Sequence, residues 1–315
     1  MARVAVQLTN FTGGELSPRL DGRNDLQKYA TGCKTLENMI IFPHGSAARR
    51  SGTQFVAEVK DSTKETRLIP FEFSTTQTYI LEFGNQYIRF FKDNGQILSS
   101  GSPYEISSPY LEAELFDIKF AQSADVMYIC HPNHPAKKLS RTGHTSWSLT
   151  SVDFTDGPYM DENISSTTIS TSAHTVGTGR TLTASSTTGI NDNTGFQTTD
   201  VGRLIRFRDG YGKITARTST TVVTIEILED MGSSSSSANW SLGAFSETTG
   251  HPSCVTFFEQ RLVFAATLSQ PQTIFFSKSG DYENMDENRG GTIADDDAII
   301  YTIASNQVNA IRFMT

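Results

Sequence analysis

Residues 67–98 read RLIPFEFSTTQTYILEFGNQYIRFFKDNGQIL, and this stretch decides the fold class. Its apolar and aromatic side chains alternate with polar ones or run together for about five to seven residues, which is typical of β-strands. Asp93-Asn94-Gly95 interrupts the apolar pattern with residues that favour the tight turn of a β-hairpin. The stretch therefore predicts an antiparallel meander of three or four strands.

The same layout recurs twice along the chain. Residues 116–132 (FDIKFAQSADVMYICHP) and 136–154 (AKKLSRTGHTSWSLTSVDF) form one copy, and residues 254–285 (CVTFFEQRLVFAATLSQPQTIFFSKSGDYENM) form the other. A β-propeller repeats four-stranded antiparallel sheets of about 40 residues around an axis. Three such meanders therefore predict propeller blades.

Composition agrees with an all-β protein and disfavours a helical bundle. The 315 residues are 37% hydrophobic, 10% aromatic and only 19% charged, and Ser, Thr, Gly and Asn make up much of the rest. No apolar run approaches the roughly 20 residues of a membrane-spanning helix, and the first residues of the sequence lack the apolar core typical of a signal peptide. Three widely spaced cysteines predict free thiols and no disulfide framework.

These patterns divide the chain into four parts. We expect an N-terminal docking arm over residues 1–60 and propeller blades 1 and 2 over residues 61–159. A Ser/Thr-rich insert over residues 160–250 predicts a small β-barrel or sandwich domain, and residues 251–315 predict a further blade and a truncated next blade. Because a propeller needs at least about four blades to close, we expect an incomplete propeller that missing sequence or a partner completes.

The arm differs in charge from the rest of the chain. Residues 1–53 carry seven Lys and Arg against four Asp and Glu, whereas the whole chain has a net charge of −8. Asn24 or Asp25 is expected to cap a short helix that includes Leu26 and Met39. An extended basic segment predicts docking on a neighbouring subunit, and an ordinary solvated surface is the alternative. The candidate subunit or adaptor interface residues are Arg19, Arg23, Lys28, Tyr29, Arg49 and Arg50.

Several spaced segments carry a family likeness. They are GGELSPRLDGRNDLQKY, LENMIIFPHGSAARRSGTQFV, RLIPFEFS, QSADVMYICHP, HPSCVTFFEQRLVFAAT, PQTIFFSKSGDY and DDDAIIYTIASNQVNAI. Together they resemble the tail nozzle proteins, or tail tubular proteins B, of short-tailed double-stranded DNA bacteriophages (podoviruses). The resemblance covers most of the chain outside the insert. Members of that family are much longer, with the remaining blades and a distal tip domain beyond the corresponding point.

The resemblance implies a structural virion protein. The sequence contains no nucleophile elbow, phosphate-binding glycine loop, HExxH motif or paired carboxylates, so we expect no enzymatic activity and no cofactor. The resemblance also implies a homo-oligomeric ring, a hexamer, below the adaptor of the portal and tail complex, with a surface for tail fibres or spikes. Double-stranded DNA would pass through the ring during ejection without specific binding. The expected location is the virion tail, after assembly in the host cytoplasm. The alternative is a host-surface module whose insert binds glycan.

Two constellations could carry chemistry. Cys130, His131 and His134 in CHPNHP could ligate zinc, but no fourth ligand follows at metal-site spacing, so we expect no metal site. The acidic residues between Asp281 and Asp297 do not match a calcium-binding loop. A solvated loop is the simplest interpretation, and a channel-facing surface that repels DNA phosphates is the functional one. The possible channel-facing residues are Asp295, Asp296 and Asp297.

Overall fold

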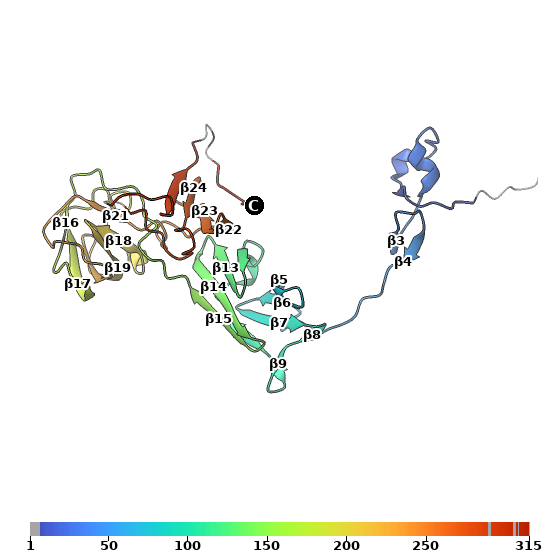
Figure 1. Ribbon diagram of the computed structural model, residues 1–315, viewed down its shortest axis with the longest axis horizontal. Helices are drawn as coiled ribbons and strands as arrows, with labels where there is room; N and C mark the ends of the chain where they lie inside the picture. The colour runs from blue at the N-terminus through green and yellow to red at the C-terminus, as the bar shows by residue number, and fades with distance from the viewer. Residues whose placement is uncertain (1–6, 289–290, 305–306, 308, 315) are drawn as a thin grey trace, which may run out of the picture. The chain divides into compact units, whose positions relative to one another are not determined.

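The computed structural model describes residues 7–288, 291–304, 307 and 309–314, which form two compact units, Met1–Val56 and Ala57–Thr315 (Figure 1). The first six residues of the expected arm, and residues 289–290, 305–306, 308 and 315 of the expected last blades, lie outside these ranges. Of the described residues, 42% lie in strands and 5% are helical, all of them in 3₁₀ helices, and the sheets include a curled half-barrel. The all-β prediction is confirmed.

The first unit contains only short elements. They are β1 (Gly14–Glu15), η1 (Pro18–Leu20), η2 (Gln27–Thr31), β2 (Gly32–Cys33), β3 (Met39–Ile41) and β4 (Ala47–Arg49). β1 pairs with β2 in parallel, and β3 pairs with β4 as a hairpin. Of the helix expected to include Leu26 and Met39, only η2 forms, as a 3₁₀ helix with Leu26 at its N-cap, because the chain becomes extended at Gly32 to pair with Gly14. A Cβ at Gly32 would meet the Leu16 side chain at 2.5 Å.

The stretch at residues 67–98 forms the first meander. Its sheet has the order β11-β7-β6-β5, with β8 also paired to β7. The strands are β5 (Arg67–Ser74), β6 (Gln77–Gly84), β7 (Tyr87–Lys92), β8 (Gly95–Gln96) and β11 (Glu105–Ser107), and a separate small hairpin joins β9 (Leu98–Ser99) to β10 (Ser102–Pro103). Asp93 and Asn94 have φ angles of 52° and 60°, as a two-residue type I′ turn requires. The predicted hairpin turn is confirmed.

The second and third meanders each form a four-stranded antiparallel sheet in sequence order. The 3₁₀ helix η3 (Glu112–Glu114) precedes the second sheet, and its role is described below. The second sheet contains β12 (Lys119–Ser123), β13 (Val126–His131), β14 (His134–Gly143) and β15 (Ser146–Ser151). The third contains β22 (Cys254–Phe258), β23 (Arg261–Ala265), β24 (Thr273–Phe276) and β25 (Ile299–Thr302). β25 lies beyond the predicted third meander, residues 254–285, and completes its sheet by pairing with β24.

The second sheet contributes to two different hydrophobic cores. Along β13, Met127 and Ile129 belong to a core shared with the first meander, whereas Tyr128 and Cys130 belong to a core shared with the third. Successive side chains of a strand point to opposite faces, so the alternation along β13 gives each face a packing partner. The three meanders are therefore packed face to face in sequence order.

The insert forms its own six-stranded antiparallel sheet and its own core. The elements are β16 (Ile169–Thr171), β17 (Gly177–Ala184), η4 (Thr198–Asp200), β18 (Leu204–Phe207), β19 (Gly210–Arg217), β20 (Val222–Ile227) and β21 (Trp240–Leu242). Arg203 and Asp200 form a fully buried ion pair at 2.9 Å, and Arg203 also donates to the carbonyl of Gly243 at 2.7 Å. In the described part of the chain, no helix is long and apolar enough to cross a membrane.

Candidate functional site

The first unit presents the expected interface residues at its surface. Arg19, Lys28 and Arg49 are exposed and form no ion pair with any residue that the structure describes. Arg23 is held in a two-bond pair with Asp25, both bonds 2.8 Å long, and Arg50 donates to the Asn38 side chain at 2.7 Å.

Tyr29 is half-buried, and its hydroxyl accepts a hydrogen bond from the Gly22 N–H at 3.2 Å. Of the five candidate cations, Arg19, Lys28 and Arg49 are therefore free to meet a partner, whereas Arg23 and Arg50 already have partners within the unit.

The same unit buries no hydrophobic side chain. Among residues 7–56 the one buried residue is Gly45, and the first buried hydrophobic residue of the described chain is Ile69. The exposed large hydrophobic residues of this unit are Leu8, Leu26, Met39, Ile40, Phe42, Phe55 and Val56. Because hydrophobic burial is the main favourable term in folding, this unit lacks the usual source of stability.

The three candidate channel residues have different environments. Asp295 and Asp296 are exposed, whereas Asp297 is only 4% exposed. The Asp297 carboxylate accepts from the Ala294 N–H at 2.8 Å and pairs with Lys278 at 2.9 Å, and these two contacts lower its pKa. The Asp297 carboxylate thus faces the protein, so an exposed channel role for it does not fit, whereas Asp295 and Asp296 keep exposed side chains.

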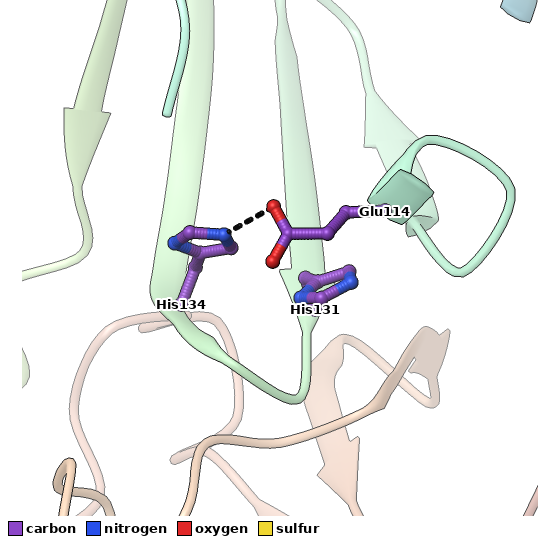
Figure 2. A group of neighbouring side chains, drawn as sticks. All are labelled: Glu114, His131 and His134. Carbon is purple, nitrogen blue, oxygen red and sulfur yellow. Dashed lines mark hydrogen bonds and ion pairs between the residues drawn. The ribbon is translucent and has the colours of Figure 1, made fainter. Parts of the chain in front are cut away.

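A histidine and carboxylate cluster lies at the end of the β13–β14 hairpin, and we call its members, Glu114, His131 and His134, the Glu-His-His cluster (Figure 2). His131 ends β13 and His134 begins β14, so the two residues are paired across the two-residue turn. Glu114 comes from η3, and its Oε2 accepts from His134 Nε2 at 2.8 Å. One ligand-type atom from each side chain lies within 4.8 Å of the others.

The sequence motif CHPNHP supplied two of these three residues. Cys130 is not a member, because neighbouring residues of a strand face opposite sides and its thiol lies in the core shared with the third meander. Burial raises the pKa of the Cys130 thiol, as expected for an unreactive core cysteine. Glu114 was missed, and no spacing signal connects it to a motif that begins 16 residues later.

The cluster holds its carboxylate charged and its buried imidazole neutral. Burial opposes ionisation of Glu114, but the Leu111 N–H and His134 outweigh this effect and lower the pKa of the carboxyl group. Burial lowers the pKa of His131, which is only 2% exposed. His131 Nδ1 accepts from the Asn133 N–H at 3.2 Å, while its buried Nε2 has no hydrogen-bond partner among the described residues.

A cavity of about 690 Å³ lies beside this hairpin and is lined by Pro132, Asn133, Glu247 and His251 among others. His251 is buried and pairs with Glu247 at 3.1 Å, and its backbone N–H donates to the Pro132 carbonyl at 3.3 Å. Burial lowers the pKa of His251 despite the Glu247 carboxylate. His251, in the lining of this cavity, therefore places a further imidazole near the hairpin turn.

The insert offers little for the alternative of glycan binding. Three of its four candidate aromatic platforms, Phe196, Phe207 and Trp240, are at most 2% exposed, and Tyr211 is half-buried. A glycan platform needs an aromatic face open to solvent. Phe196, Phe207 and Trp240 instead fill the core of the insert.

Known proteins add no identification at this point. No family model matches the chain, and no curated protein matches it. The fold and the sites described above therefore define the class of molecule directly: an all-β protein with consecutive antiparallel sheets and a separate, weakly packed N-terminal unit.

Proposed function

We propose that this chain is a structural virion protein, a subunit of the tail nozzle ring of a short-tailed bacteriophage. In this proposal the consecutive meanders are propeller blades, and the ring surrounds part of the DNA ejection channel and carries tail fibres or spikes. Two features support it: the sequence resemblance, and three antiparallel sheets packed face to face in sequence order.

The observation that carries the assembly part is the N-terminal unit, which buries no hydrophobic side chain of its own among residues 7–56. An isolated two-stranded hairpin is at best marginally stable in water, so this unit needs a surface to pack on. Residues 1–53 carry a net charge of +3, and since the whole chain carries −8, the remaining residues carry −11. A basic arm and an acidic body favour docking of the arm on the body of a second copy, or on the adaptor.

The mass of the purified assembly tests this proposal. We expect the full chain to form a closed ring, and we expect the triple variant Arg19→Glu, Lys28→Glu, Arg49→Glu to dissociate, because it reverses three exposed cations of the arm that form no ion pair with the described residues. The matched control is Lys64→Glu, which reverses a cation of the body that forms no ion pair with the described residues and should assemble normally. A monomeric wild-type chain, or an unchanged ring in the triple variant, would contradict the proposal.

A further inference from the structure

The Glu-His-His cluster brings together the donor set of a transition-metal site. It offers two imidazole nitrogens and one carboxylate oxygen from two separate elements, the β13–β14 hairpin and η3 (Figure 2). Zinc accepts this combination of nitrogen and oxygen donors, whereas calcium and magnesium prefer oxygen donors alone. The chemistry of the side chains therefore selects a divalent transition metal over the alkaline-earth ions.

Buried His131 supplies an independent indication that a ligand belongs here. Its Nε2 is buried without a hydrogen-bond partner among the described residues, although buried polar atoms are nearly always satisfied. In Figure 2 the His131 ring lies beside the Glu114 carboxylate, on the side nearer the turn of the hairpin. A metal ion bound between these side chains would satisfy the unpartnered nitrogen.

The tautomer of His131 must change on metal binding. The Asn133 N–H donates to Nδ1, so in neutral His131 the proton is on Nε2. Coordination through Nε2 moves this proton to Nδ1, and the 3.2 Å hydrogen bond from Asn133 is lost. Asn133 is exposed, so water can accept from its N–H instead, and the cost is one long hydrogen bond at a solvated turn.

The geometry requires only local adjustment. Two donors at about 2.0–2.1 Å from a tetrahedral ion are about 3.3 Å apart. The Glu114 Oε2 and His134 Nε2 atoms, now 2.8 Å apart in a hydrogen bond, would separate slightly, and His131 would move closer from within 4.8 Å. Glu114 and His134 are partly exposed, so water can reach the fourth coordination position.

We propose that Glu114, His131 and His134 form a zinc site that fastens η3 to the β13–β14 hairpin. His134 Nε2 now donates its proton to the Glu114 carboxylate, so when this nitrogen binds the ion the proton moves to Nδ1, as it does in His131. The ion replaces the Glu114–His134 hydrogen bond as the link between the two elements. Because the ion binds the folded chain, it stabilises that state by mass action.

Zinc titration of the full chain, stripped of metal with a chelator, tests the proposal. We expect one equivalent of zinc to bind by calorimetry and to raise the unfolding temperature. The variants Glu114→Gln and His131→Gln should weaken binding by about tenfold or more, since each removes one of three protein ligands. His174→Gln is the matched control, because it removes a histidine paired with a carboxylate, Asp230, at 2.9 Å on the surface of the insert.

Cobalt substitution gives a readout that does not depend on the folding of variants. The wild-type chain with one equivalent of Co²⁺ should show the intense visible absorption of a four-coordinate ion, and zinc should displace it. Weak, six-coordinate absorption, no stoichiometric binding, or equal loss of affinity in His174→Gln would overturn the site. Unchanged affinity in folded Glu114→Gln and His131→Gln chains, checked by circular dichroism, would overturn it as well.

Discussion

Asp156 is a carboxylic acid that the fold keeps away from water. The residue is 9% exposed and accepts a hydrogen bond from the Tyr159 hydroxyl at 2.6 Å. Burial raises the pKa of Asp156 from 3.8 to about 6, and the charges of Asp286 and Glu229 act in the same direction, whereas Tyr159 and Arg206 oppose it. The folded state therefore favours the protonated acid more than the unfolded chain does.

This shift predicts a pH dependence of stability with a definite sign. A folded-state pKa above the unfolded value contributes stability that is present below about pH 4 and is lost as the pH rises through about 6. Asp156→Asn should remove this dependence, because a neutral amide still accepts from Tyr159 and asparagine tolerates the φ angle of 39°. Between about pH 4 and 7.5 the wild-type chain should lose on the order of 2 kcal/mol relative to the variant.

Urea unfolding at several pH values measures the difference. The control is Asp153→Asn, which removes a carboxylate that is 84% exposed and pairs with Lys213 at the surface. Its stability curve should stay parallel to that of the wild-type chain. If the stability of Asp156→Asn changed with pH in parallel with that of the wild-type chain, Asp156 would have the same pKa in the folded and unfolded states.

At the scale of elements, turns and strands that depend on neighbouring residues could be predicted, whereas contacts between residues far apart in the sequence could not. The Asp93-Asn94 turn could be predicted because both residues tolerate positive φ angles, and the strands beside it follow from their apolar pattern. The pairing of His131 with His134 is also local, since a two-residue turn joins them. Glu114 reaches the same place only through the packing of η3, and no sequence spacing encodes that contact.

The environment of individual charged residues also could not be predicted from the sequence. The acidic residues before β25 look alike in sequence, yet Lys278 pairs with both Asp286 and Asp297 and leaves Asp295 and Asp296 exposed. The outcome depends on which backbone N–H groups and cations the fold brings near each carboxylate. A run of charge in sequence predicts a polar surface, but it does not identify the member that is buried.

The insert should fold as an isolated fragment of residues 160–250. Every side chain of its buried core comes from residues 169–242, and the Trp240 indole donates within the fragment to the Thr167 carbonyl at 3.0 Å. We expect dispersed amide resonances typical of β-structure. A random-coil spectrum would show that the insert depends on the rest of the body.

A variant of the same fragment provides the control. Asp200→Asn leaves the Arg203 charge buried without its counter-ion, which costs about 3–5 kcal/mol. This is a large part of the roughly 5–14 kcal/mol of stability expected for a domain of about 90 residues. The variant fragment should therefore be largely unfolded under conditions in which the parent fragment is folded.

The whole molecule joins two units that differ in the source of their stability. Residues 57–315 contain all the buried hydrophobic cores of the described chain, and their consecutive sheets share those cores. Residues 7–56 have backbone hydrogen bonds and short hairpins but no apolar core. Burial of apolar area therefore stabilises the body, and under the proposed function contacts within the assembly would supply the burial that the N-terminal unit lacks.

Thermal unfolding at two protein concentrations tests this division. When dilute and unassembled, the fragment 57–315 should unfold within about 2 °C of the full chain, because residues 7–56 bury no hydrophobic side chain. At concentrations that favour assembly, the full chain should gain stability by mass action, whereas the fragment should not. A lower unfolding temperature of the dilute fragment would show that the arm supports the fold of its own chain. An equal dependence on concentration in both proteins would place the subunit contacts in the body alone, because the arm could then contribute nothing to association.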